Sequence, residues 1–169
     1  MPEISGTPSG RGRRFAVIAS RFNEEVTTKL VSGATDALVK HGVSPDAIDV
    51  VWVPGAWELP AVARRLLSNE RYDALVAVGA VIRGETPHFD YVAGEAARGL
   101  SRASAEYDRP IGFGVLTCDT VEQALARAGG AHGNKGWDAA LAALEMADLF
   151  SRLDAGLDQS HEPDDASPR

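Results

Sequence analysis

A chain of 169 residues with 44% hydrophobic content suits one globular domain with a single sizeable core. The formal net charge of −7 argues against nucleic-acid binding, which requires a basic face, and means that an anionic substrate must be held by local positive groups. Cys118 is the only cysteine, the N-terminus has no signal-peptide core and no apolar run is long enough to span a bilayer, so the sequence predicts a cytoplasmic protein without membrane contact.

The first strand and helix are expected after a polar N-terminal arm. Residues 1–13 are rich in Gly, Ser and Pro and cannot pack alone, although Pro2–Ser5 is extended enough to pair with another chain. FAVIA within Arg14–Ser20 is a short buried-strand pattern. Asn23 is a plausible N-cap for the next helix, and Gly42 is its expected stop. The apolar residues of this helix recur at helical spacing: Val26, Leu30, Ala34 and Leu38.

The same unit of strand, turn and helix then repeats. Ile48–Val53 is a β-branched strand that ends at Pro54 and Gly55. In the helix that follows, Pro60 is tolerated because it falls in the first turn. One face of this helix is apolar and consists of Leu59, Val62, Ala63, Leu66 and Leu67.

The stretch Ala74–Asp90, ALVAVGAVIRGETPHFD, joins an apolar run to a cluster of polar residues. The run is largely β-branched, which predicts a central parallel strand. Ligands of open α/β sheets lie beyond the carboxyl ends of such strands. Gly84 is expected to free the backbone there, and Gly84, Glu85 and Thr86 precede a helix N-terminus, where backbone N–H groups bind anions. A glycine in a turn is weak support by itself.

The second half of the chain adds one strand and three helices. The pattern predicts a helix over 89–106, a strand over 111–116 and a short helix from a Thr120–Gln123 capping box through Ala128. A glycine-rich loop over 129–136 precedes a closing helix that begins at Trp137.

Strands that alternate with helices through short connections predict the fold class and the domain. We expect a flavodoxin-like three-layer α/β/α sandwich around a four-stranded parallel sheet. The domain covers residues 1–153, with 1–13 as its extended arm. Residues 154–169 carry five acidic residues against one arginine and are expected to be an acidic disordered tail.

Four motifs occur together: SRFN at Ser20–Asn23, PGAWELP at Pro54–Pro60, GAVIRGETPHFDYV at Gly79–Val92 and GNKG at Gly133–Gly136. Through them the chain resembles the 6,7-dimethyl-8-ribityllumazine synthases over about 14–149. The resemblance implies condensation of 5-amino-6-(D-ribitylamino)uracil with 3,4-dihydroxy-2-butanone 4-phosphate, the penultimate step of riboflavin synthesis, with no metal and no organic cofactor. The residues agree, because joining an amine to a ketone needs proton transfer, a held phosphate and a flat slot for a heteroaromatic ring.

The resemblance assigns the uracil substrate to residues near the ends of the strands. Phe22 would stack on the ring, although its position alone favours a hydrophobic staple at the helix start. Glu58 could accept two sugar hydroxyls, or could only favour the helix dipole. Phe113 would come from a neighbouring subunit, whereas in a monomer it would be a core residue. The full implied set is Phe22, Ala56, Trp57, Glu58, Ala80, Val81, Ile82, Phe113 and Lys135, in which the backbone of 80–82 reads the uracil edge.

The same resemblance places the butanone phosphate on Gly84, Glu85, Thr86 and Arg127, with His88 as the proton-transfer residue. An unperturbed imidazole exchanges protons near neutral pH, although a lone His at a helix start is more often a surface residue. Arg127 could bind two phosphate oxygens with its planar fork, or could only complement the end of a helix. Arg83 receives no ligand role.

Three other classes of protein fit the sequence less well. A signalling receiver needs acidic residues at its strand ends, where this chain has Arg21 and Arg83. A Rossmann dehydrogenase would show a Gly-rich fingerprint, which Phe15–Asn23 lacks. The remaining alternative is a non-catalytic flavin-binding or shell-forming relative, which could lose His88 or Arg127, and both are present.

The resemblance also implies an assembly. Phe113, Arg127, His132 and Lys135 would face the cleft of a neighbour, which places the sites between subunits of a homopentamer. The compact loop GGAHGNKG is similar to that of members whose pentamers form an icosahedral shell, and riboflavin synthase is a further expected partner. The N-terminal arm would add a strand to the neighbour's sheet. His132 is expected to be a loop residue, since no second metal ligand lies at a suitable spacing.

Overall fold

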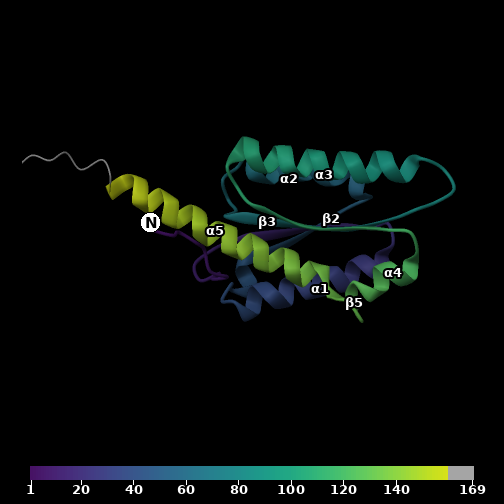
Figure 1. The fold of residues 1–169 in the computed structure, drawn as a ribbon, viewed down its shortest axis with the longest axis horizontal. Coiled ribbons are helices and arrows are strands. Elements are labelled where there is room, and N and C mark those ends of the chain that lie inside the picture. Colours follow the sequence, from purple (N-terminus) through teal and green to yellow (C-terminus); the bar gives the residue numbers. More distant parts are fainter. Residues whose placement is uncertain (160–169) are drawn as a thin grey trace, which may run out of the picture.

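The computed structural model describes residues 1–159, which form an α/β fold around one parallel sheet (Figure 1). Hydrogen bonds join its four strands in the order β2-β1-β3-β4. The strands are β1 (Phe15–Ser20), β2 (Ile48–Val53), β3 (Ala74–Ile82) and β4 (Ile111–Cys118). The α-helices are α1 (Glu24–Lys40), α2 (Leu59–Leu67), α3 (His88–Tyr107), α4 (Val121–Ala126) and α5 (Lys135–Gln159). Two 3-10 helices, η1 (Pro45–Ala47) and η2 (Ala56–Glu58), and a hairpin of β5 (Ala128–Gly130) and β6 (Gly133–Asn134) complete the fold.

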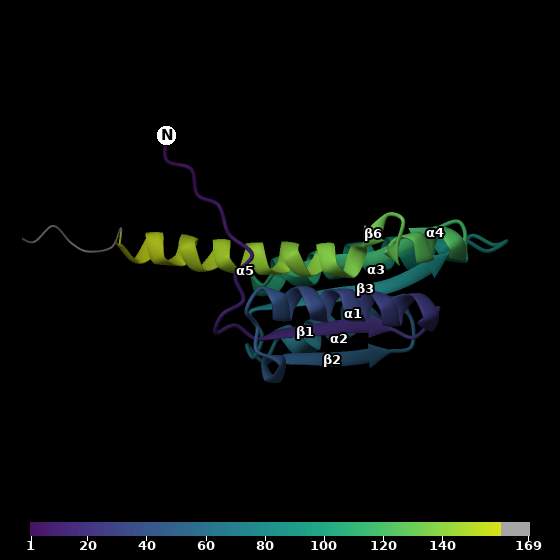
Figure 2. The same cartoon turned by 90° about the horizontal axis from the view of Figure 1, so that it is seen from below.

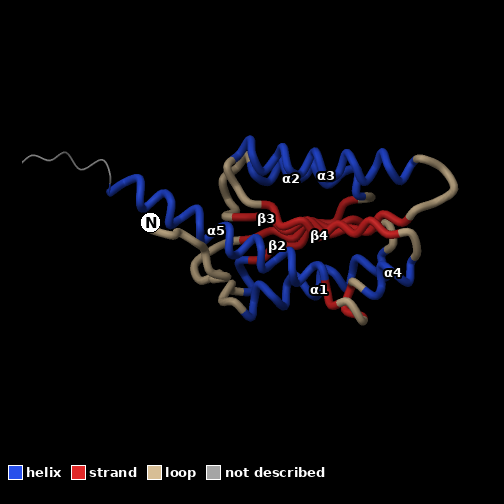
Figure 3. The backbone as a smooth tube through the Cα atoms, viewed as in Figure 1, coloured by secondary structure: helices blue, strands red, loops and turns tan. Residues whose placement is uncertain are grey.

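The direction of each crossover decides which face a helix covers. The chain leaves β1 for β2 on one side, then returns past β1 to β3 and β4 on the other. Because parallel crossovers are right-handed, α1 must lie on one face of the sheet and α2 and α3 on the opposite face. In the structure α2 and α3 pack together on one face, and α1, α4 and α5 cover the other (Figures 1 and 3). The predicted three-layer flavodoxin-like sandwich is confirmed.

The core lies on both faces of the two central strands. β1 is buried along its whole length, and β3 is buried from Ala74 to Ala80. Successive side chains of β1 point to opposite faces, so Val17 packs in the layer of α1 and α5 while Ile18 packs in the layer of α2 and α3. The predicted inner face of α1 is confirmed, because its four apolar residues are buried. Within residues 1–159, none of the helices combines the length and the apolar character needed to cross a membrane.

Several local expectations differ from the structure. The short helix expected to run through Ala128 ends at Ala126, because Ala128 begins β5. Asn23 stands at the N-cap position of α1, but its backbone is left-handed (φ 60°) and its side chain makes no capping bond. Residues 129–136 contain the β5–β6 hairpin in place of a loop, because Gly129 and Gly133 adopt positive φ and allow a tight reversal. α5 continues to Gln159, since extending a formed helix costs little, so the predicted disorder fails for 154–159; residues 160–169 lie outside the described residues.

The N-terminal arm lies against α5 of its own chain (Figure 2). Asp148 on α5 accepts hydrogen bonds from the backbone N–H and the hydroxyl of Thr7 at 2.9 and 3.1 Å, and pairs with Arg13 and Arg152. The Thr7 N–H, followed by the Arg152 guanidinium and the Thr7 hydroxyl, lowers the pKa of the Asp148 carboxyl to about 2. Gly6 approaches α5 so closely that a Cβ atom would lie 2.0 Å from the carbonyl oxygen of Glu145. Only the exposed tip, residues 1–5, is therefore left to reach another subunit.

Candidate functional site

The main cleft opens where the crossovers change direction. β1 and β3 are neighbours, but the helices that follow them cover opposite faces, so a crevice forms beyond their carboxyl ends. A cleft of about 690 Å³ occupies this position, between the ends of the strands and the first turn of α3. Eight of the residues predicted from the sequence line it: Phe22, Ala56, Trp57, Glu58, Ala80, Val81, Ile82 and His88.

Three aromatic side chains at the cleft are exposed to solvent. Phe22, Trp57 and Tyr91 have exposed fractions of 69%, 57% and 68%. The staple expected from the sequence would pair Phe22 with the fourth residue of α1, which is the polar Thr27, and most of the Phe22 side chain stays exposed. Its ring lies against Gly55, where a Cβ atom would come within 2.9 Å of the Phe22 ring carbon Cδ2. The cleft thus offers aromatic faces on which a flat ring can stack.

Asn23 and Tyr91 belong to the cleft but were not predicted from the sequence. The amide of Asn23 donates a hydrogen bond to the carbonyl oxygen of Ala80 at 2.9 Å, which joins the turn after β1 to the end of β3. Asn is among the few residues that tolerate a left-handed backbone, so this turn needs a residue of its type. Tyr91 lies one helical turn after His88, and this spacing could have placed both side chains on one face of α3.

Glu58 is partly engaged in local structure. Its Oε2 accepts a hydrogen bond from the Gly55 backbone N–H at 2.9 Å, which is the carboxylate half of a capping box at the start of η2; Gly55 has no side chain to supply the other half. Among the described residues its other oxygen, Oε1, has no hydrogen-bond donor. This bond to the Gly55 N–H is a local role that the sequence does not predict, and it leaves one carboxylate oxygen of Glu58 at the cleft for a ligand.

The segment after β3 supplies exposed backbone donors. Gly84, Glu85 and Thr86 are exposed, and their N–H groups have no acceptor within residues 1–159. α3 begins at His88 without a side-chain cap, so the positive end of this helix is open. Gly84 does not have a positive φ, and a Cβ atom there would meet nothing within 4 Å. Relief of backbone strain, expected from the sequence, is therefore not the reason for a glycine at this position.

Phe113, Arg127 and Lys135 lie in a different place. They line a separate hollow of about 310 Å³ beside β4, the edge strand of the sheet. Phe113 is 50% exposed, so the alternative of an ordinary core phenylalanine is wrong. Arg127 follows the last residue of α4 and donates to the Gln123 carbonyl at 3.0 Å, and Lys135 pairs with Asp138 at 3.1 Å. One chain therefore carries the predicted site residues in separate places: eight in the cleft, three in the hollow beside β4, and Gly84, Glu85 and Thr86 on the exposed loop that lines neither.

The turn that leads from β4 to Arg127 is capped on both sides. Thr120 accepts a hydrogen bond from the Gln123 backbone N–H at 3.2 Å, as the predicted capping box requires. The Gln123 side chain, however, accepts from the backbone N–H of Asp119 at 2.9 Å and not from that of Thr120. Burial raises the pKa of the Cys118 thiol, so the sulfur beside this turn stays protonated at neutral pH.

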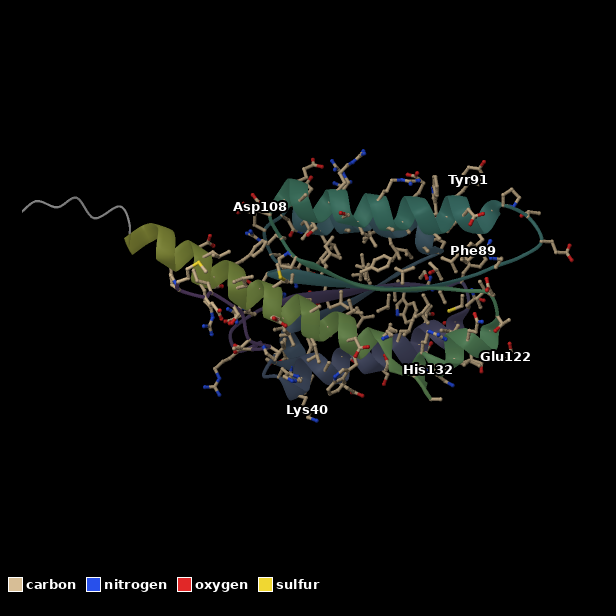
Figure 4. All side chains as sticks on the ribbon, viewed as in Figure 1. Lys40, Phe89, Tyr91, Asp108, Glu122 and His132 are labelled. Carbon is tan, nitrogen blue, oxygen red and sulfur yellow. The ribbon has the colours of Figure 1, made fainter. Side chains whose placement is uncertain are left out.

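The described residues do not present a metal site. Within 1–159, no group of three or more His, Cys, Asp or Glu side chains is placed to hold a metal ion. His132 is exposed at the tip of the β5–β6 hairpin, next to α4 and in the opposite layer from Tyr91 on α3 (Figure 4).

The family model and two curated relatives that match this chain all belong to one family. The family model of 6,7-dimethyl-8-ribityllumazine synthase matches residues 12–151. A 6,7-dimethyl-8-ribityllumazine synthase of Gemmatimonas aurantiaca is 68% identical over 152 residues, which cover 90% of this chain and 93% of that relative. One of Aquifex aeolicus is 52% identical over 153 residues, which cover 90% of this chain and 99% of that relative. The matched region includes both the cleft and the hollow beside β4.

Proposed function

The chain belongs to the 6,7-dimethyl-8-ribityllumazine synthase family, and we propose that its active site is assembled from two subunits. The enzyme condenses 5-amino-6-(D-ribitylamino)uracil with 3,4-dihydroxy-2-butanone 4-phosphate and releases phosphate and water.

The charge of the cleft supports a shared site. None of the described residues that line the cleft is Lys or Arg, although one substrate carries a phosphate group. The hollow beside β4 has the missing charges, Arg127 and Lys135, together with an exposed Phe113. Placing the hollow of one subunit over the cleft of the next would supply cations to the phosphate and a second apolar wall to the ring.

Each substrate then has its own part of the site. The ribitylaminouracil ring would stack at Phe22 and Trp57, with the backbone of Ala80–Ile82 at its polar edge, Glu58 at its ribityl chain and the neighbour's Lys135 nearby. The butanone phosphate would lie on the open N–H groups of Gly84–Thr86 at the start of α3, opposite the neighbour's Arg127. His88, between the two, would transfer protons during condensation.

Two variants, measured first singly and then in mixed assemblies, test this arrangement. His88→Ala should lower kcat by about 10²-fold or more, because general acid-base catalysis is lost. Binding of both substrates should be retained. Arg127→Ala should raise the KM of the butanone phosphate more than that of the uracil substrate, because it removes a bidentate phosphate contact. Neither variant should approach wild-type activity at limiting butanone phosphate.

Co-expression of both variants in equal amounts then separates the two models of the site. If the site is shared, random assembly pairs an intact His88 side with an intact Arg127 side in roughly a quarter of the sites, and activity returns to about that level. If the site lies within one chain, every site lacks one of the two residues and no activity returns. Wild-type subunits at the same total concentration are the reference.

The proposal extends to the whole particle. The exposed tip of the arm would add a strand to a neighbour's sheet in a homopentamer, and the compact β5–β6 hairpin supports further assembly of pentamers into an icosahedral shell. Riboflavin synthase is the proposed protein partner, to be tested by co-sedimentation with the assembled particle. The single buried cysteine, Cys118, supports a cytoplasmic location.

A further inference from the structure

Arg83 holds together three segments around the loop that follows β3. Its backbone N–H donates to the carbonyl of Cys118 at 2.9 Å and so continues the pairing of β3 with β4. Its guanidinium donates to Asp119 at 2.9 Å, lies 3.6 Å from a carboxylate oxygen of Asp90 and sits 4.3 Å from the centre of the Phe89 ring. Phe89 lies on the side of α3 that faces the sheet (Figure 4).

The loop between these contacts has little support of its own. Within residues 1–159, the only hydrogen bond made by Gly84–Pro87 joins the Pro87 carbonyl to the Asp90 N–H at 3.0 Å. The loop is therefore fixed by its two ends, the end of β3 and the first turn of α3. Arg83 reaches from the first end to the second, because Phe89 and Asp90 directly follow His88.

Asp119, which accepts a hydrogen bond from the Arg83 guanidinium, is itself held in place. The backbone N–H of Asp119 is bonded to the Gln123 side chain at 2.9 Å, so the carboxylate stands on a capped turn. A planar guanidinium can approach two carboxylates and stack on a ring at the same time, which an ammonium group cannot do.

We propose that Arg83 is a positioning residue, whose guanidinium sets the loop Gly84–His88 in the geometry that binds the butanone phosphate and aims His88. The inference rests on the proposed function, which places that substrate on this loop. The pairs of Arg83 are exposed, and exposed ion pairs add little to stability, so their effect lies in the position of the loop. Small displacements of catalytic groups reduce rates strongly.

Kinetics of Arg83→Ala give the first test. The KM of the butanone phosphate should rise about 10-fold and kcat should fall by a similar factor, while the KM of the uracil substrate changes by less than about 2-fold. The unfolding midpoint should shift by no more than about 3 °C. Arg83→Lys keeps the charge without the fork, so most of the KM defect should remain. The matched control is Arg98→Ala, which removes an exposed α3 arginine paired with Glu95.

Asp119→Asn separates positioning from direct phosphate binding. If Arg83 acts through Asp119, this variant shows the same defect in weaker form, and the double variant is no worse than Arg83→Ala within about 2-fold. If Arg83 binds the phosphate itself, freeing it from Asp119 leaves the KM unchanged or lowers it, and the proposal is overturned. It is equally overturned if Arg83→Ala leaves both KM values at wild-type levels or if Arg83→Lys restores full activity.

Arg127→Ala in the same assay separates this inference from the proposed function. If Arg127→Ala raises the butanone phosphate KM and Arg83→Ala does not, only the role of Arg83 is wrong. If neither variant raises it, the proposed phosphate site itself is wrong.

Discussion

Glu58 serves the local fold and the proposed site with its two carboxylate oxygens. The Gly55 N–H holds Oε2 at 2.9 Å, which fixes the orientation of the side chain. Oε1 has no donor among the described residues, and the side chain lines the cleft. Because its side chain is already fixed, this carboxylate can accept hydrogen bonds from hydroxyl groups without a further loss of side-chain entropy.

Glu58→Gln is expected to weaken binding of the ribityl chain. A glutamine has only one acceptor oxygen, so while that oxygen is bonded to the Gly55 N–H, an NH₂ group stands where Oε1 would accept from the ribityl hydroxyls. The KM of ribitylaminouracil should rise about 10-fold, and that of the butanone phosphate should change by less than about 2-fold. Steady-state kinetics with each substrate varied in turn measure both values, with Glu95→Gln on the exposed face of α3 as the control. An equal rise in both KM values would instead indicate damage to the turn at η2.

At the same scale, sequence could identify residues whose side chains carry obvious chemistry but not those whose role depends on backbone shape. His88, Trp57 and Glu58 stand out by type and by their place after a strand. Asn23 contributes through a left-handed turn and a bond to a carbonyl oxygen, and neither is visible in a residue pattern. The sequence gives no sign of a role for Arg83, because its partners Asp90 and Asp119 meet it only in the folded chain.

The sheet and its helices could be predicted because buried elements repeat apolar residues at a fixed period. β2 was predicted with its observed bounds, and the helix predicted over 89–106 is observed over His88–Tyr107. The β5–β6 hairpin escaped prediction, since its strands are made mainly of glycine and have no apolar alternation. The end of α5 was not predicted either. Its Asp and Gly residues indicate coil, but a helix that has already formed can extend through such residues at little cost.

The contact between the arm and α5 has a pH dependence that follows from the Asp148 carboxyl. Its pKa is lowered from 3.8 to about 2, so the ionised form stabilises the folded chain. This contribution is present above the ordinary pKa of about 4 and is lost as the pH falls through about 2. The shift corresponds to about 2 kcal/mol, or less once solvent screening of the partly exposed partners is counted.

Asp148→Asn should therefore destabilise the protein at pH 7 by up to about 2 kcal/mol, and the difference from wild type should shrink below about pH 4 and vanish below about pH 2. Denaturant unfolding at several pH values measures it. The control is Asp36→Asn, an exposed aspartate of α1 that makes no ion pair among the described residues. A loss that stays constant from pH 7 to pH 2 would show that packing, and not the charge of Asp148, anchors the arm.

At the scale of the whole molecule, a single subunit leaves apolar surface uncovered. Phe22, Trp57 and Tyr91 are exposed at the cleft, Phe113 is exposed on the edge strand and Ile4 is exposed on the arm. These side chains come from segments far apart in the sequence, and all belong to the surfaces assigned to subunit contacts. Sequence alone could not decide whether Phe113 was a core or an interface residue, because this depends on what lies beyond the open edge of β4.

The mass of the native protein tests this interpretation. With a chain of 17.9 kDa, a pentamer has a mass of about 90 kDa, and a closed icosahedral shell has one on the order of 1 MDa. Phe113→Asp places a charge where the ring should be covered by a neighbour, so light scattering should show a shift towards the monomer together with loss of activity. Val39→Asp, at an exposed apolar position outside the groups of site residues, is the control and should keep the native mass. A fully active monomer would contradict the shared site, whereas a stable pentamer without larger particles would contradict only the shell.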